Sequence, residues 1–544
     1  MATDHTQFGG TQTAIRPLLP ERLISLCMGY GEIQEFTEDA TLYTWGDRRV
    51  DFLVVLEGQA SVSVPIVPSG EEIIYRHSPG EFLGNTYLLT ERGMLIDVKV
   101  RSGSRVLRIP NANFRKFLTS EPEVAEVVLA AFMHRCASLV SGSKGGALVV
   151  GYTNSNATLR IRRFLEGNRF PHRFLDPELE PEAEGILAAL RLSHLPLPVV
   201  LAPNIALEDP SNEVLADRLG VFEPISVDEL YDVAIVGAGP AGLAAAVYAA
   251  SEGLRTIVLE GQAPGGQAGT SSKIENYLGF PAGVTGTELA SLAQNQAQKF
   301  GAKLVVSQNV VLLDCEQRPF ALYLSGGSCV HSRTVIIATG ASYRQLSEPT
   351  GTNVPDGIHY SATAIEAQVC KDKIVVVVGG GNSAGQAAMF LSKSAEHVHM
   401  VIRKPELSIT MSDYLAARIT QSKKITLHRS TKVCAVHGDQ HLTGVTLKSV
   451  DTEQRTTLST TNLFVMIGAE PRTELLRPSI ALDSHGFVLT GGQVGGQDTP
   501  YATSVPGVFA VGDVRAGSVK RVASAVGEGS VVVAMLHSYL STTD

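Results

Sequence analysis

The spacing of hydrophobic and polar residues divides the chain into three regimes, and the first consists of short apolar runs. Between about residues 20 and 120 these runs are separated by Gly, Asp and Pro, and they include Phe52–Leu56, Ala60–Val64 and Val106–Ile109. Short apolar runs bounded by turn residues predict β-strands. From about Glu121 to Val140 the apolar spacing is that of a helix. We therefore expect a β-rich front unit that closes with one long helix.

The second regime alternates between strand and helix patterns over residues 147–222, after a Gly/Ser segment at Ser141–Gly146 that predicts a flexible joint. The final helix is expected to begin with Ser211 or Asn212 as its N-cap. This pattern predicts a small α/β unit. Its expected elements are strand 147–153, helix 156–167, strand 171–176, helix 182–192, strand 195–203 and helix 211–220.

The third regime, residues 226–544, combines continuous Val/Ile runs with helical segments. Runs such as DVAIVG, RTIVLE, RTVIIATG, KIVVVVGGG and HVHMVI end in or near glycine. Continuous apolar strands of this kind are typical of buried parallel sheets. Two of them lead directly into glycine-rich turns followed by helices.

The first glycine-rich turn is DVAIVGAGPAG, with Gly237, Gly239 and Gly242 in the G-x-G-x-x-G positions. The three glycines permit a tight turn, approach of the backbone to a pyrophosphate, and close packing of helix on strand. The helix N-terminus supplies N–H groups and a positive dipole for the phosphates. The next strand ends at Glu260, a carboxylate that would bind a ribose 2′-hydroxyl and repel a 2′-phosphate. This site is predicted to hold FAD or NAD.

The second turn is KIVVVVGGGNSA, with Gly379, Gly381 and Ala384 in the same three positions. The strand that follows ends in Arg403 and Lys404 instead of an acid. Basic side chains at this position pair with a 2′-phosphate, which favours NADP(H). A solvated Arg–Lys turn on an NAD site is the alternative. Two nested dinucleotide folds indicate hydride transfer from a nicotinamide to a flavin.

Composition and charge exclude several classes of protein. Charged residues make up 18% and apolar residues 44%, which is ordinary for a globular chain, and the length predicts three or four domains. The net charge of −9, without a basic run, speaks against a nucleic-acid partner. We see no membrane span and no secretory signal. The six cysteines form no C-x-x-C pair and no zinc pattern, so we expect isolated thiols in a cytoplasmic protein and no metal site.

From about Tyr231 to Leu540 the sequence resembles the low-molecular-weight thioredoxin reductase family. The motifs that agree, in order, are GAGPAG at 237–242, Glu260 with GQ at 266–267, IENYLGFP at 274–281, ATG at 338–340, GGGNSA at 379–384, GVFAVGDV at 507–514 and RVASAVGEGS at 521–530. The resemblance implies FAD and NADPH as cofactors and a homodimer. It also implies that the helix beginning near Val522 directs its N-terminus at the flavin, where its dipole would stabilise negative charge.

The resemblance assigns cofactor contacts residue by residue, and it assigns no catalytic residue. The implied FAD contacts are Gly237, Gly239, Pro240, Ala241, Gly242, Glu260, Gly261, Gly266, Gln267, Asn276, Val310, Thr339, Gly340, Gly512, Asp513, Arg521, Val522 and Ala523. The implied NADPH contacts are Gly379, Gly381, Asn382, Ser383, Ala384, Arg403 and Lys404, with Ser408 at the third 2′-phosphate position of the family.

One departure from the family bears directly on function. The redox C-x-x-C of the family falls on Ala362-Thr363-Ala364-Ile365, so neither sulfur is present. Glu366 aligns with the acid that follows the dithiol; we interpret it as a relic, with a proton donor as the alternative. The lone thiol of Cys370 cannot form an internal disulfide. Thioredoxin reduction by the family mechanism is therefore not expected.

The middle unit resembles a thioredoxin or glutaredoxin fold. LPLP at 195–198 precedes a strand, with Pro198 as the candidate cis-proline. The redox pair expected at the start of the first helix is replaced by Ser155-Asn156-Ala157-Thr158. We interpret the unit as a docking or spacer domain without cysteine.

Residues 20–135 resemble a cyclic-nucleotide-binding β-roll, with SPGEFLGNTYLL at 78–89 on its phosphate-binding cassette. Asn85 takes the place of the ribose-binding Glu, Met94 that of the phosphate-binding Arg, and Arg92 is shifted by two positions. Loss of the cationic partner should weaken phosphate binding. A changed small-molecule or protein ligand, or a structural role, is favoured over cyclic-nucleotide binding.

Together these patterns predict an α/β protein with two nested Rossmann-like domains behind a β-roll and a small thioredoxin-like domain. The expected domains are 1–140 (β-roll), 141–225 (thioredoxin-like), 226–348 with 474–544 (FAD) and 349–473 (NADPH). The predicted function is electron transfer from NADPH through FAD to an unidentified acceptor: a quinone, an iron–sulfur or flavin protein, oxygen or a small disulfide. The alternatives are a flavin-bearing sensor or scaffold and a cyclic-nucleotide-regulated reductase.

Overall fold

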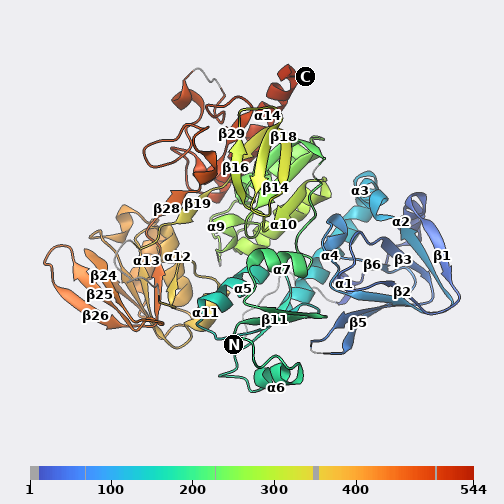
Figure 1. The fold of residues 1–544 in the computed structure, drawn as a ribbon, viewed down its shortest axis with the longest axis horizontal. Helices are drawn as coiled ribbons and strands as arrows, with labels where there is room; N and C mark the ends of the chain where they lie inside the picture. The colour runs from blue at the N-terminus through green and yellow to red at the C-terminus, as the bar shows by residue number, and fades with distance from the viewer. Residues whose placement is uncertain are drawn as a thin grey trace.

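In the computed structural model, most of the chain forms four structural units (Figure 1). We name them the front unit, the middle unit and, after the cofactors that the sequence predicts for them, the FAD unit and the NADPH unit. The middle unit lies between the front unit on one side and the NADPH unit on the other, and the FAD unit lies above it in this view. The residues described are 12–67, 69–226, 228–271, 273–346, 355–495 and 499–543.

The front unit consists of two four-stranded antiparallel sheets, β1-β8-β3-β6 and β2-β7-β4-β5. The rings of Phe52, Phe82, Phe114 and Phe132 pack together between the first sheet and the helices, with centroids 5.2–6.2 Å apart. The strands are β1 (Glu32–Phe36), β2 (Ala40–Tyr43), β3 (Phe52–Glu57), β4 (Ala60–Pro65), β5 (Glu71–His77), β6 (Phe82–Leu83), β7 (Asp97–Val100) and β8 (Ser104–Ile109). The helices are α1 (Gln12–Ile15), α2 (Glu21–Cys27), α3 (Asn111–Ser120) and α4 (Pro122–Ser141), with 3-10 turns at Met28–Tyr30 and Thr86–Leu89.

Helix α4 confirms the predicted long helix within one residue at each end. Among the described residues it is the one helix whose length and composition would allow it to cross a membrane. Its inward side, including Val128, Phe132 and Leu139, is buried against the front unit. The charged Arg135 on the same side is buried too. This packing accounts for the apolar composition of α4 as that of a core helix.

The middle unit is a four-stranded sheet in the order β10-β9-β11-β12, with β9 and β10 parallel and the other pairs antiparallel. The Leu197–Pro198 peptide bond before β11 is cis, as predicted. Helix α7 begins after Ser211, whose side chain caps it, also as predicted. The pattern missed β12, a short strand with alternating burial. The elements are β9 (Ala147–Val150), α5 (Asn156–Gly167), β10 (His172–Leu175), α6 (Glu182–Ala189), β11 (Val199–Ala202), β12 (Ile205–Glu208) and α7 (Asn212–Arg218).

The joint between the front and middle units is packed, which corrects the prediction of a flexible segment. The indole Nε1 of Trp45 donates to the Gly145 carbonyl at 3.2 Å. A Cβ on Gly145 would lie 2.8 Å from the Leu95 carbonyl oxygen, and one on Gly146 would lie 1.6 Å from that of Pro171. These glycines therefore allow close contact between the two units, which composition alone cannot distinguish from flexibility.

The FAD unit is built on a mixed sheet in the order β15-β14-β13-β18-β17-β16, with β29 beside β18. The strands β15, β14, β13, β18 and β29 are parallel, as the continuous apolar runs predicted. The first part contains β13 (Leu230–Val236), α8 (Pro240–Ser251), β14 (Thr256–Glu260), α9 (Gly266–Gly269), α10 (Gly286–Lys299), β15 (Lys303–Val306), β16 (Val310–Asp314), β17 (Phe320–Leu324) and β18 (Cys329–Ile337). The second part contains 3-10 turns at Glu474–Leu476, Gly491–Val494 and Gly512–Val514, β29 (Val508–Ala510) and α14 (Val522–Thr543).

The NADPH unit is inserted into the FAD unit through a two-stranded ribbon of β19 (Ala341–Tyr343) and β28 (Ala469–Pro471). It holds an all-parallel sheet, β20-β27-β21-β22-β23, and a three-stranded antiparallel sheet, β24-β25-β26. The elements are β20 (Ile358–His359), α11 (Ala364–Val369), β21 (Ile374–Val378), α12 (Asn382–Leu391), β22 (His397–Val401), a 3-10 turn at Leu407–Ile409, α13 (Asp413–Gln421), β23 (Ile425–His428), β24 (Thr431–His437), β25 (Gly444–Ser449), β26 (Arg455–Ser459) and β27 (Asn462–Val465).

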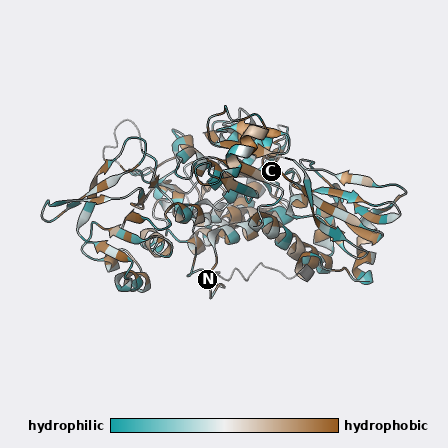
Figure 2. Ribbon diagram, turned by 90° about the horizontal axis from the view of Figure 1, so that it is seen from below, coloured by the Kyte–Doolittle hydropathy of each residue, from teal (hydrophilic) through white to brown (hydrophobic). Residues whose placement is uncertain are grey.

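Hydropathy follows this arrangement, with apolar residues gathered in the strands and helices and hydrophilic residues in the outer loops (Figure 2). The predicted boundary between residues 348 and 349 lies outside the described residues, as do residues 1–11.

Candidate functional site

The first glycine-rich turn connects β13 to α8 and has the geometry expected of a phosphate cradle. Gly237 has φ +104°, and a Cβ there would lie 2.4 Å from the Ala338 carbonyl oxygen. A Cβ on Gly242 would lie 1.9 Å from the Gly237 carbonyl oxygen. A Cβ on Gly239 would meet nothing within 4 Å. Gly237 and Gly242 thus serve the packing, while Gly239 faces open space at the start of α8, where a pyrophosphate would approach.

Glu260, at the end of β14, is held in place by the backbone. Its Oε2 accepts a hydrogen bond from Ala238 N at 2.8 Å, and its Oε1 accepts one from Gln262 N at 2.9 Å. The side chain is 9% exposed, and burial raises its pKa against the opposing effect of these N–H donors. A carboxylate fixed in this way beside the glycine turn retains acceptor capacity for ribose hydroxyls.

The second glycine-rich turn repeats this geometry between β21 and α12. Gly379 has φ +140°, and a Cβ there would lie 2.2 Å from the Met466 carbonyl oxygen. Ala384 is fully buried, and a Cβ on Gly381 would meet nothing within 4 Å. The Asn382 side chain accepts a hydrogen bond from the Ser412 backbone N–H at 2.9 Å, which ties the start of α12 to the segment before α13. Both turns therefore fit a dinucleotide.

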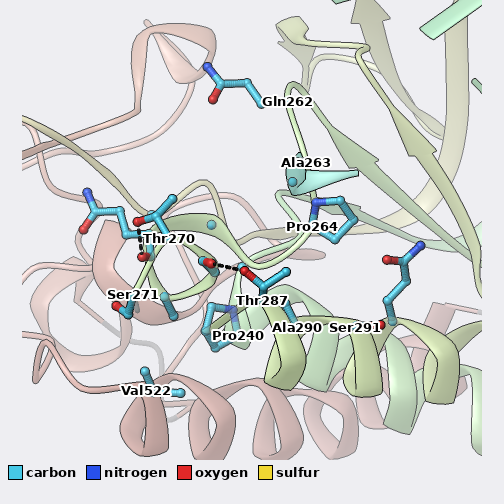
Figure 3. A pocket seen from close by; sticks show the side chains of 18 of the residues that line it. Pro240, Gln262, Ala263, Pro264, Thr270, Ser271, Thr287, Ala290, Ser291 and Val522 are labelled. Carbon is cyan, nitrogen blue, oxygen red and sulfur yellow. Dashed lines mark hydrogen bonds between the residues drawn. The ribbon is translucent and has the colours of Figure 1, made fainter. Parts of the chain in front are cut away.

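A single cavity of about 1390 Å³ connects the two turns and extends to the middle and front units. Figure 3 shows part of its wall, with Val522 at the start of α14 and Pro240 at the start of α8. The loop between them is held by Thr270, which donates to the Gln267 carbonyl at 2.8 Å, and by Thr287, which donates to the Gly269 carbonyl at 3.1 Å. The predicted cofactor residues that line the cavity are Gly237, Gly239, Pro240, Ala241, Glu260, Gly266, Gln267, Asn276, Thr339, Gly340, Asn382, Ser383, Gly512, Asp513, Arg521, Val522 and Ala523.

The remaining predicted residues do not line this cavity. Gly242, Gly379 and Ala384 sit in tight backbone packing, as described above. Gly261 faces Asn309, whose Oδ1 would lie 2.0 Å from an added Cβ, and Val310 is buried in the core of the FAD unit. Gly381 caps α12. Arg403 and Lys404 are exposed just beyond the end of β22, outside the cavity. Their role at a 2′-phosphate remains a prediction.

At the other end of the FAD unit, polar groups surround the start of α14. Burial raises the pKa of Asp513, and the nearby Lys520 ammonium opposes this effect. Thr339 donates to the Arg472 carbonyl at 2.7 Å, which ties the end of β18 to the returning chain. Sequence reasoning missed Arg472, Lys520 and Tyr343, all of which line the cavity. Arg472 and Tyr343 lie where the chain passes between the FAD unit and the NADPH unit, and this position is the signal that could have identified them.

Residues 362–365, onto which the sequence resemblance places the dithiol of the family, lie at the cavity edge and the start of α11. Thr363 and Ala364 line the cavity, while Ala362 packs against the core of the NADPH unit. Thr363 caps the helix, and its backbone N–H donates to the Glu366 carboxylate at 2.7 Å. This capping box explains Glu366 without a proton-transfer role.

Glu366 also joins the NADPH unit to the middle unit. Its side chain is fully buried, and its Oε1 accepts from Arg163 Nε at 2.6 Å. Leu159 on α5 packs against Ile365 and Val369 on α11. Helices α5 and α11 therefore pack on each other through an ion pair and an apolar contact.

In the front unit, the segment that the sequence aligns with a phosphate-binding cassette is held by contacts within the protein. Met94 is 1% exposed inside the β-roll. The guanidinium of Arg135 donates to the carbonyls of Gly84 and Phe82 at 2.9 and 3.0 Å, in the segment aligned with the cassette. Asn85 caps the turn that follows by accepting from Tyr87 N at 2.9 Å.

All six cysteines are free. Cys27 and Cys370 are buried, and burial raises the pKa of each thiol to about 12. Cys136 lines the part of the cavity formed by α4, away from the glycine turns. A high pKa leaves a thiol protonated and unreactive at neutral pH.

The comparisons with known proteins agree with this geometry. Residues 231–529 match the pyridine nucleotide-disulphide oxidoreductase family, and residues 33–121 match the cyclic nucleotide-binding domain. The chain is 35% identical over 316 residues to a thioredoxin reductase of Mycolicibacterium smegmatis, covering 58% of this chain and 98% of the relative. It is 34% identical to NADPH-dependent thioredoxin reductase 3 of Arabidopsis thaliana, covering 58% of this chain and only 59% of that protein.

Solved structures give the same result. The chain superposes on a thioredoxin reductase of T. acidophilum with a TM-score of 0.53 and 31% identity, over 58% of this chain and 100% of the other. The corresponding values for the Lactococcus lactis thioredoxin reductase are 0.53 and 27%, over 57% and 99%. The chain therefore belongs to the pyridine nucleotide-disulphide oxidoreductase family, as an oxidoreductase related to the thioredoxin reductases, which use FAD and NADPH.

Proposed function

We propose that this protein takes electrons from NADPH into a bound FAD and passes them directly to an acceptor other than a protein dithiol of its own. The single observation that carries the proposal is the shared cavity. It is lined by both glycine-turn helices and by the segment at Thr363–Ala364, which supplies neither of the two thiols that family members use. The acceptor candidates are a quinone, an iron–sulfur or flavin protein, oxygen or a small disulfide.

The residues around the cavity suit both cofactors. When bound, FAD would supply the capacity to take a hydride from a nicotinamide. Gly239 and Gly381 leave room at the starts of α8 and α12 for two pyrophosphates, and Glu260 is fixed to accept from a ribose. Asp513 and the N-terminus of α14 line the cavity at the end of the FAD unit away from Glu260. The N–H groups of that helix end would favour negative charge placed there.

An anaerobic titration of the purified protein with NADPH tests the proposal. We expect loss of the flavin absorption band at one equivalent of NADPH, and its return when a quinone or oxygen is admitted. A flavin band that persists in excess NADPH would refute the proposal. NADPH-dependent reduction of thioredoxin at a rate equal to quinone reduction would refute the direct transfer.

A flavin-bearing sensor or scaffold is the second candidate, and the joint between α5 and α11 favours it. The buried contact of Glu366 with Arg163, together with Leu159 on Ile365, fixes the NADPH unit against the middle unit. Such a contact would slow any movement of the NADPH unit that turnover requires. Stopped-flow rates of flavin reduction distinguish the enzyme from the sensor or scaffold. Fast reduction with fast reoxidation indicates an enzyme. Flavin reduction that is slower than the relaxation of the protein indicates a sensor.

We further propose that the middle unit is a thioredoxin-like domain that has lost its redox function. The sheet order, the three helices and the cis-proline at Pro198 support this. Its helix α5 begins with Ser155–Thr158 in place of a cysteine pair. Regulation by a cyclic nucleotide is less well supported, since Arg135 and Met94 occupy the interior of the β-roll.

A further inference from the structure

Arg92 is a buried cation without a matching anion. Its side chain is 5% exposed and lines the part of the cavity where the front, middle and FAD units meet. The Nη1 atom donates to the Asn168 carbonyl at 3.2 Å. Neither Nε nor Nη2 makes a hydrogen bond of standard geometry, although Arg92 also interacts with the hydroxyl of Tyr87. A guanidinium buried with two unused donors is costly unless an anion completes it.

The surrounding charges do not neutralise Arg92. Within the described residues no carboxylate forms an ion pair with it. The acid that acts on it by its field is Glu223, which is fully buried and whose pKa burial raises to about 7. Glu223 accepts instead from Gln298 Nε2 at 3.3 Å. Arg92 therefore has Glu223 as an acidic neighbour but no carboxylate bonded directly to it.

A second guanidinium reaches the same place from the middle unit. Arg169 lines the cavity, and its Nη1 donates to the hydroxyl of Ser291 on α10 of the FAD unit. Figure 3 shows Ser291 on the wall formed by α10. Arg169 directly follows Asn168, whose carbonyl accepts from Arg92, so the two cations come from neighbouring segments. Both oppose the rise in the pKa of Tyr87 that burial causes. On the front unit, the wall is completed by apolar side chains of α4, Met133 and Val140.

We propose that Arg92 and Arg169 form a binding site for a small oxyanion, such as a phosphate group, at the junction of the front, middle and FAD units. The site is distinct from the interior of the β-roll, where Arg135 already occupies the carbonyls of Gly84 and Phe82. A phosphate in this part of the cavity would be held by the positive charges of Arg92 and Arg169. The ligand is either free phosphate or the phosphate of a small organic molecule whose body packs on Met133 and Val140.

The proposed site is linked to the flavin side by a chain of hydrogen bonds. Asn168, whose carbonyl accepts from Arg92, donates through Nδ2 to the Gln262 carbonyl at 3.0 Å. The backbone N–H of Gln262 in turn donates to Glu260. An anion on Arg92 would therefore hold the loop that positions the ribose-binding carboxylate. Occupancy of the site is expected to tighten FAD retention.

The test uses the FAD-loaded full chain and the fluorescence of Trp45, the one tryptophan of the sequence, which lies in the front unit beside Gly145. Inorganic phosphate should give a saturable change, and Arg92→Met should weaken binding at least tenfold, which is about 1.4 kcal/mol. Arg76→Met is the matched control, because Arg76 is exposed on β5 of the same unit, and it should titrate like the parent. Equal titration of parent and Arg92→Met, or no saturable change in the parent, would overturn the proposal.

Thermal unfolding provides an independent readout. In phosphate-free buffer Arg92→Met should unfold at the same or a higher temperature than the parent, because a buried unpaired charge is removed. Phosphate should raise the unfolding temperature of the parent but not that of Arg92→Met. If Arg92 had a purely structural role, the variant would lose stability equally with and without phosphate, and the proposal would be wrong.

Arg169→Met, which keeps Arg92, should show a reduced phosphate effect. If phenyl phosphate binds more tightly than inorganic phosphate, the ligand is an organic phosphate. If the two bind equally, the ligand is free phosphate.

Discussion

The guanidinium of Arg163 donates from its Nε to the carboxylate of Glu366 at 2.6 Å, and this ion pair joins two helices, neither of which begins with a cysteine. Arg163 lies on α5 of the middle unit and Glu366 on α11 of the NADPH unit. Beside them Arg162 donates to Gln368 at 3.0 Å, and Leu159 covers Ile365. In a protein that passed electrons between these helix starts, the contact surface would carry sulfur; here it holds an ion pair and an apolar contact.

Replacing Arg163 should destabilise the contact between the two units. In Arg163→Met the buried Glu366 keeps its bonds from Thr363 but loses its cationic partner. A buried acceptor left without one partner costs about 1–3 kcal/mol. The change should appear as a lower midpoint in urea unfolding. Arg173→Met is the control, since its ion pair with Glu182 on the same unit is exposed, and its midpoint should stay almost the same. An equal loss in both variants would contradict a special role for the joint.

The same joint predicts a dependence of stability on acid. Burial alone would raise the pKa of Glu366, but Arg163 and Thr363 outweigh it and hold the pKa below the ordinary value. A depressed pKa contributes stability above the unfolded value of about 4.3, and this contribution is lost as the pH falls through the folded value. The parent should therefore lose stability below about pH 4.3 more steeply than Glu366→Gln. Parallel curves of unfolding temperature against pH would show that the prediction is wrong.

Two glycines of the first turn should respond oppositely to the same substitution. Gly239→Ala meets nothing within 4 Å and has an ordinary φ of −70°, so the apoprotein should keep its stability. The added methyl group would stand where the pyrophosphate approaches, so FAD should be lost on gel filtration. Gly242→Ala would instead bring the methyl group 1.9 Å from the Gly237 carbonyl oxygen, and the fold itself should be destabilised. Retention of FAD by Gly239→Ala would exclude this position for the cofactor.

The choice between NADPH and NADH should depend on the two cations after β22. Arg403 and Lys404 are exposed and available to a 2′-phosphate. Removing both in Arg403→Ala/Lys404→Ala should raise KM for NADPH about ten- to a hundredfold, at roughly 1.5–3 kcal/mol for hydrogen bonds to charged groups, with KM for NADH little changed. Lys423→Ala, an exposed lysine of the same unit, is the control. Flavin reduction at a series of coenzyme concentrations measures both constants. Equal changes in KM for NADPH and for NADH would show that Arg403 and Lys404 form a solvated turn that does not bind the 2′-phosphate.

A pair of histidines in the NADPH unit should make that unit sensitive to mild acid. His399 Nδ1 lies 3.0 Å from His428 Nε2, and burial together with His428 and His397 lowers the pKa of His399 to about 4. The unfolded chain then binds more protons than the folded one between about pH 4 and 6.5, so stability rises with pH across this window. His399→Asn should flatten the rise. Thermal unfolding across this pH range measures the rise in stability. A rise of the same steepness in the variant would rule out His399 as its source.

The fold was largely predictable because its long elements obey simple periodicities. The helix predicted at 156–167 matches α5 residue for residue, and the apolar runs became the parallel strands of the two dinucleotide sheets. The strand β12 was missed, because only four residues alternate there and nothing in the pattern distinguishes them from a loop. The packed glycines at 145 and 146 were read as flexible, because glycine composition is the same for a loose linker and a close contact.

The candidate site was predictable where a motif fixes the backbone and unpredictable where distant units meet. Gly237, Glu260 and Gly379 lie as their motifs require. The contact of Arg163 with Glu366 and the position of Arg92 could not be foreseen, because they depend on how four units pack, and no local pattern encodes a distance across units.

The ribbon of β19 and β28 makes the nicotinamide module a detachable insert. Ala341 and Pro471 are direct neighbours on the two strands, so the polypeptide leaves the flavin sheet and comes back at one spot. A short turn that bridged these two residues would excise everything between them without cutting a single strand of the larger sheet. Such an excision would remove the electron source genetically and would also break the contact of Arg163 with Glu366, while the units toward the N-terminus stay attached to the flavin half.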